Sequence, residues 1–270
     1  MTLGIFGDSY VCHKALMQDD GSSDEKTKKF MHSLLTWVEY LEINHGITSD
    51  NHGCMGSSIF YSYSKFLEHH EQYDTIVFVV SQNDRINIPL EYLRDRPEFL
   101  KSTCFNLQTA RFGLNSEYKD IRTISKVAID YFTYLHNEIA YMHFANLMVS
   151  DIKRKCEKKN IKLLIIPAFS LSQTGTDELV TENSDGEGIL GQVSILEEQA
   201  WGLGIDDISE SEVAASFFDV RTCHMTDDNN RILAQKIADW VRHGHAFNLN
   251  VGTDFIAPTM DDKFKYFVPK

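Results

Sequence analysis

Residues 74–81 read Asp-Thr-Ile-Val-Phe-Val-Val-Ser, and this stretch decides the fold class of the chain. Its apolar run is continuous and rich in β-branched and aromatic residues, which is typical of a parallel strand covered on both faces. A similar run at 161–166 stops at Pro167, and a shorter one spans residues 3–6. The sequence therefore predicts three buried strands of one sheet.

Segments with helical periodicity alternate with these strands. Apolar residues recur at helical spacing between residues 24 and 43, again over 58–70, and over 121–159 with room for one break. A last helix is expected from the cap Thr226 to about residue 241. Because strands and helices alternate, we expect an α/β fold with a mainly parallel sheet covered by helices.

Two stretches depart from this alternation. Residues 85–119 read as an irregular insertion, and residues 168–215 read as a long surface excursion rich in Ser, Gly, Asp and Glu. No internal repeat or linker divides the chain, so we expect one domain over 1–243 and a tail over 244–270. The tail either packs back on the domain or mediates self-association into a homo-oligomer, and it contains the aromatic residues Phe247, Phe255, Phe264, Tyr266 and Phe267.

The composition argues against several classes of protein. A net charge of -13 disfavours binding to the phosphate backbone of nucleic acids, which requires clustered Lys and Arg. No apolar run approaches the length of a transmembrane helix. Five cysteines at irregular spacing do not form a disulfide framework, and no signal peptide is expected because the Gly-Asp-Ser element begins at residue 7. We therefore expect a cytoplasmic protein, with release by lysis left open for a phage product.

Four short blocks bear side chains suited to hydrolytic chemistry. Gly7-Asp8-Ser9 follows the first strand, where a serine at a helix mouth can attack an electrophile while its own amide stabilises the anion. A turn containing Gly56 can bring a backbone N–H close to a ligand, and Asn83 can donate a hydrogen bond after the strand 74–81. His224 precedes the last helix and can act as a general base, because imidazole titrates near neutral pH.

In this order, the four blocks resemble those of the SGNH (GDSL-type) hydrolase family. The resemblance implies a three-layer, flavodoxin-like sandwich with a mainly parallel sheet. It implies Ser9 as nucleophile, His224 as base, and an oxyanion hole formed by the N–H groups of Ser9 and Gly56 and the side chain of Asn83. The implied activity is that of a serine esterase without a cofactor. The substrate would be a small-molecule or carbohydrate ester, with carbohydrate O-deacetylation favoured over lipolysis.

The chain departs from the family pattern at two positions. Ser81 stands where the third block normally has Gly, and Arg221 stands three residues before His224, where the family has Asp. Asp219 would orient the imidazole if the loop is rearranged; otherwise a backbone carbonyl does so and the unit is a Ser–His dyad. The competing reading is a non-catalytic structural or carbohydrate-binding module with the same fold, for example in a phage particle.

Simpler roles are open for several of these residues. Asn83 could cap a turn, His224 could be a surface histidine, and Asp8 is expected to fix its loop through backbone hydrogen bonds. A metal site is not expected, because no pair among the Cys and His residues near this edge has ligand spacing such as Cys-X2-Cys; they are Cys12, His13, His52, Cys54, Cys223 and His224.

Overall fold

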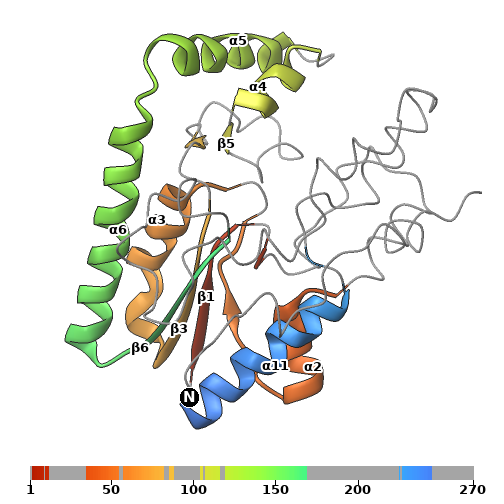
Figure 1. Ribbon diagram of the computed structural model, residues 1–270, viewed down its shortest axis with the longest axis vertical. Helices are drawn as coiled ribbons and strands as arrows, with labels where there is room; N and C mark the ends of the chain where they lie inside the picture. The colour runs from red at the N-terminus through yellow and green to blue at the C-terminus, as the bar shows by residue number, and fades with distance from the viewer. Residues whose placement is uncertain are drawn as a thin grey trace, which may run out of the picture.

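The computed structural model of the chain centres on a four-stranded sheet in which every strand is parallel to its neighbours (Figure 1). The strand order is β2-β1-β3-β6. The strands are β1 (Leu3–Phe6), β2 (Asp50–Asn51), β3 (Thr75–Val80) and β6 (Lys162–Pro167). The structure describes residues 2–8, 10–11, 35–54, 57–81, 85–87, 104–105, 107–115, 119–168, 225 and 227–244.

The strand order reverses between β1 and β3. From β1 the chain moves outward to β2, then returns to the other side of β1 to form β3 and continues to β6. The register pairs Phe6 with Phe78 and Val80 with Pro167, so the carboxyl ends of β1, β3 and β6 lie at the same edge. In open α/β sheets, ligands bind in the crevice outside the carboxyl ends at such a switch point.

Side-chain alternation along the strands divides the core between the two faces of the sheet. Ile5, Val77 and Leu164 point to the face covered by α2 (Trp37–His45) and α11 (Asp227–His243). Phe6, Phe78 and Ile165 point to the face covered by α3 (Ile59–His69) and α6 (Glu138–Lys159). The sheet is therefore buried between two helical layers, which explains the continuous apolar runs of its strands.

The remaining described elements are short or lie beyond the sheet. A helical turn, η2 (His70–Gln72), follows α3, and β4 (Ile86–Asn87) pairs antiparallel with β5 (Cys104–Phe105). The helices α4 (Leu107–Gly113) and α5 (Lys119–Tyr134) lie beyond the carboxyl edge of the sheet, at the top of Figure 1. Among the described residues, no helix has the length and apolarity needed to cross a membrane.

The predicted strands at 3–6, 74–81 and 161–166 are confirmed within a residue or two at each end. The predicted break within 121–159 separates α5 from α6 at residues 135–137, and α3 and α11 match the helices expected there. Of the helix expected over 24–43, the described part is α2. The prediction of a mainly parallel sheet covered by helices is confirmed for the four-stranded sheet formed by β2, β1, β3 and β6.

Two parts of the described structure differ from the prediction. The sequence did not predict strand β2, because two residues are too short to show an alternating pattern. The segment 85–119 is not irregular throughout, since it contains β4, β5, α4 and the start of α5. Apart from Ala168, the excursion 168–215 lies outside the described residues, as does the tail beyond Gly244.

Candidate active site

The five residues predicted for the site lie outside the described residues: Ser9, Gly56, Asn83, Asp219 and His224. The structure does describe the residues that flank four of them. Asp8 and Tyr10 border Ser9, Ser57 follows Gly56, Arg85 comes two residues after Asn83, and Met225 follows His224. These flanking residues lie at the carboxyl edge of the sheet and show how the chain is held on either side of the predicted site residues.

The end of β1 is fixed by close packing and by Asp8. A Cβ at Gly7 would come within 2.9 Å of Val79 Cβ, so only glycine fits between β1 and β3 here. Asp8 Oδ1 accepts a hydrogen bond from the Tyr10 N–H at 3.2 Å, and the Asp8 carbonyl accepts from the Val11 N–H at 3.1 Å. These bonds agree with the interpretation that Asp8 is a structural residue.

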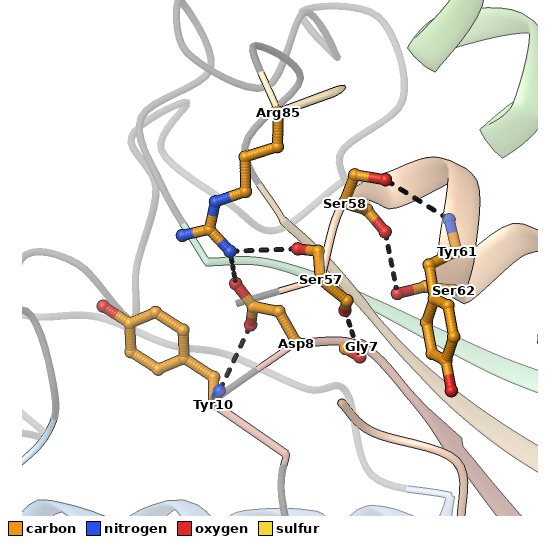
Figure 2. Close-up of polar contacts among 8 residues, drawn as sticks. All are labelled: Gly7, Asp8, Tyr10, Ser57, Ser58, Tyr61, Ser62 and Arg85. Carbon is orange, nitrogen blue, oxygen red and sulfur yellow. Dashed lines mark hydrogen bonds and ion pairs between the residues drawn. The ribbon is translucent and has the colours of Figure 1, made fainter. Parts of the chain in front are cut away.

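The loop from β2 to α3 is bonded along this end of β1. The N–H groups of His52 and Cys54 donate to the carbonyls of Ile5 and Gly7 at 2.8 and 3.2 Å. The buried Ser57 Oγ also donates to the Gly7 carbonyl, at 3.3 Å (Figure 2). The chain on both sides of residues 55–56 is therefore held against the Gly7-Asp8 segment.

The helix that follows this loop begins with a side-chain cap. Ser58 Oγ accepts a hydrogen bond from the Tyr61 N–H at 3.4 Å, which satisfies one of the free N–H groups at the start of α3. Ser62 Oγ donates back to the Ser58 carbonyl at 3.3 Å. Figure 2 shows both bonds beside the Ser57 contact. The serines at 57 and 58 therefore fix the position at which the loop passes into α3.

Arg85 connects all three segments of this edge through one nitrogen. Its Nη1 donates to Asp8 Oδ2 at 3.1 Å and to the Ser57 carbonyl at 2.9 Å (Figure 2). The Asp8 side chain is fully buried, and the Arg85 side chain is 14% exposed. The chain after β3 is thereby tied to the end of β1 and to the start of α3.

Burial and the ion pair act in opposite directions on Asp8. Burial raises the pKa of Asp8 above its usual range because it penalises the charged carboxylate. The guanidinium of Arg85 and the N–H of Tyr10 lower the pKa and offset part of that rise. Asp8 is thus a buried carboxylate whose ionised form depends on Arg85.

Ser81 directly follows β3 at the same edge. Its side chain is fully buried, and among the described residues its Oγ has no hydrogen-bond partner. The alternation along β3 puts Ser81 on the face of Val77 and Val79, which is the face covered by α11. A buried hydroxyl therefore stands directly after β3 at the carboxyl edge of the sheet.

His52 is one of the two described members of the Cys and His set considered for a metal. Its ring stacks between Phe6 and His69, at centroid distances of 4.8 and 4.4 Å, and Nε2 lies 2.7 Å from the Tyr73 hydroxyl. Burial lowers the pKa of His52, with the nearby His69 acting in the same direction. No group of three or more potential metal ligands occurs among the residues that the structure describes.

Sequence reasoning missed Arg85. It follows Asn83-Asp84 directly, but an arginine after a strand is most simply a surface residue. Its role depends on Asp8, 77 positions earlier, and no local pattern joins the two.

A scan against models of protein families, a search of curated proteins and a search of solved structures find no match to this chain.

Proposed function

We propose that the chain is a serine esterase with the SGNH arrangement, acting on a small-molecule or carbohydrate ester. The observation that supports it most is the position of Arg85. This side chain bonds Asp8, which precedes Ser9, and Ser57, which follows Gly56, and it stands two residues after Asn83. Blocks that are remote in sequence thus have flanking residues in direct contact at the switch point of the sheet.

The strand order supports the same proposal. The order β2-β1-β3-β6 corresponds to the first four strands of the flavodoxin-like order 2-1-3-4-5. In such a sheet the crevice at the switch point lies outside β1 and β3, and Gly7-Asp8 and Ser81 follow these two strands. A nucleophile at position 9 would stand at the mouth of that crevice.

The proposed reaction is a two-step acyl transfer. Ser9 Oγ attacks the ester carbonyl while His224 takes the hydroxyl proton, and the oxyanion is stabilised by the N–H groups of Ser9 and Gly56 and the Asn83 side chain. His224 then gives the proton to the leaving alkoxide, which departs as the alcohol. Water, deprotonated by His224, hydrolyses the acyl-enzyme and regenerates Ser9. Asp219, or a backbone carbonyl in a Ser–His dyad, would orient His224.

A carbohydrate acetyl ester is the substrate we favour. The sequence has no long apolar segment of the kind that covers a lipid chain. The acyl-enzyme would then be an acetyl-serine, and the chain needs no cofactor to form it.

Fluorophosphonate labelling tests the proposal, because the reagent phosphonylates an activated serine. The wild-type chain should gain one label by intact mass and hydrolyse p-nitrophenyl acetate, whereas Ser9→Ala should do neither. Ser150→Ala, at an exposed position of α6, is the matched control and should behave as wild type. A folded wild-type chain without label would overturn the esterase and favour a non-catalytic module. Equal labelling of Ser9→Ala would overturn the assignment of Ser9 as the nucleophile.

A further inference from the structure

A chain of buried hydrogen bonds joins the segment after Ser9 to the segment after His224. The indole Nε1 of Trp37 donates to the Tyr10 carbonyl at 2.7 Å. The backbone N–H of Trp37 donates to Asn230 Oδ1 at 3.0 Å, and Asn230 Nδ2 donates to the Met225 carbonyl at 3.1 Å. Tyr10 directly follows Ser9, and Met225 directly follows His224.

All four residues of this chain are buried. Trp37 is fully buried, and Tyr10, Asn230 and Met225 are at most 9% exposed. Water therefore does not compete for these bonds, and breaking one leaves a buried donor or acceptor unpaired. The bonds hold the two segments at a defined separation more tightly than apolar contact would.

Trp37 and Asn230 each have the hydrogen-bonding groups that their positions in this link require. Trp37 is the first residue of α2, so its N–H is one of the donors that the helix leaves free, and Asn230 accepts from it. The amide of Asn230 accepts with its oxygen and donates with its nitrogen, so a flipped amide would lose both bonds. Asn230 lies in the first turn of α11, where its side chain can reach both the start of α2 and the Met225 carbonyl.

From this geometry we infer that Trp37 and Asn230 are positioning residues that set the distance between Ser9 and His224. The inference rests on the esterase function proposed above. Neither residue is assigned a contact with the substrate; both act through the backbone of Tyr10 and Met225. Because a displacement of about 1 Å at a reacting pair costs on the order of 100-fold in rate, loss of this link should slow catalysis more than it weakens binding.

The kinetic test compares variants that break the link at different points. Asn230→Leu removes both amide bonds, and Trp37→Phe keeps an aromatic ring but removes the indole donor. Each should lower kcat for p-nitrophenyl acetate by about 10- to 100-fold with KM changed less than about threefold. Ile237→Val, a buried change in α11 outside the link, is the control and should keep the wild-type kcat at a temperature where every variant is folded.

The double variant tests whether the two residues act as one unit. If the link is continuous, Trp37→Phe combined with Asn230→Leu should be no slower than the slower single variant. If the losses in kcat of the two single variants multiply in the double variant, or if kcat is unchanged in both single variants, the inference is overturned.

Hydrogen exchange separates failure of this inference from failure of the esterase proposal. The Tyr10 and Val11 amides are bonded to Asp8 and report on the far end of the link. Asn230→Leu should accelerate their exchange at least about tenfold, while Ile237→Val should not. If the wild-type chain hydrolyses no ester, the catalytic role falls with the proposed function, and exchange still decides whether the link exists. Unchanged exchange in Asn230→Leu would show that it does not.

Discussion

Asp8 illustrates at the level of single residues how this edge of the sheet is stabilised. Its carboxylate is fully buried, and the charge is compensated by Arg85 together with the Tyr10 N–H. Removing one partner of a buried ion pair leaves the other charge without compensation, which costs more than the pair itself contributes. Arg85 is therefore important for folding whatever reaction the chain performs.

We predict that Arg85→Met lowers the free energy of unfolding by about 3 kcal/mol at neutral pH. The loss should shrink towards pH 4, and urea unfolding at several pH values measures it. Without Arg85 the folded-state pKa of Asp8 rises further above its ordinary value of 3.8, so the folded state binds the proton more tightly than the unfolded state. The free energy of unfolding of the variant then falls as the pH rises from the ordinary pKa of Asp8 towards its raised pKa in the folded state.

Arg154 provides a matched control for this variant. Its guanidinium also pairs with an aspartate, Asp151, but its side chain is 72% exposed. Arg154→Met should change the free energy of unfolding by less than about 1 kcal/mol at any pH. A loss in Arg85→Met that is the same at pH 4 and pH 8 would contradict the buried ion pair.

Among the elements, α3 and α6 are joined by a hydrogen bond as well as by apolar packing. The Tyr63 hydroxyl of α3 donates to Asp151 Oδ2 of α6 at 2.7 Å. Burial raises the pKa of Tyr63 to about 12, and the bond to Asp151 acts in the same direction. The phenol therefore stays protonated and can donate throughout the physiological range.

Tyr63→Phe should lower the free energy of unfolding by about 1.5–2 kcal/mol, because it removes a hydrogen bond to a charged acceptor but keeps the ring. Tyr134→Phe in α5 serves as comparison, since Tyr134 is 78% exposed, and it should change stability by less than about 0.5 kcal/mol. Chemical denaturation of the two variants side by side measures both effects. Equal free energies of unfolding for the two variants would show that the Tyr63–Asp151 bond does not stabilise the packing of α3 against α6.

The elements also show which predictions from sequence succeed. The strand 75–80 is a continuous apolar run, and the helices at 138–159 and 227–243 are long with apolar residues at helical spacing, so sequence patterns located all three. Strands β2, β4 and β5 have two residues each, and they form only because a partner strand lies alongside. Their existence depends on pairing, which a local pattern does not contain.

For the whole molecule, the two faces of one sheet are expected to fold together. Ile152 of α6 and Ile237 of α11 are both fully buried, but on opposite faces of the sheet. Truncation of either to alanine should cost about 2–5 kcal/mol. If residues 1–243 form one domain, both variants should shift the same single unfolding transition.

Thermal and urea unfolding, followed by far-UV and near-UV circular dichroism, test this expectation. Leu147→Ala, at a position that is 66% exposed, is the control for losing a large side chain and should change stability by less than about 0.5 kcal/mol. Two resolved transitions, each sensitive to one variant only, would show that the faces unfold independently.

The α/β class, the strands β1, β3 and β6 and the main helices follow from the amino-acid sequence, because periodicity and β-branched runs are local properties that need no knowledge of neighbours. The sequence also suggested four reactive blocks in a particular order. It could not show that Arg85 meets Asp8, or that Trp37 meets Asn230, 193 positions later. Those contacts exist because the strand order and the packing of α2 on α11 bring distant segments together, and burial then makes each polar bond costly to lose.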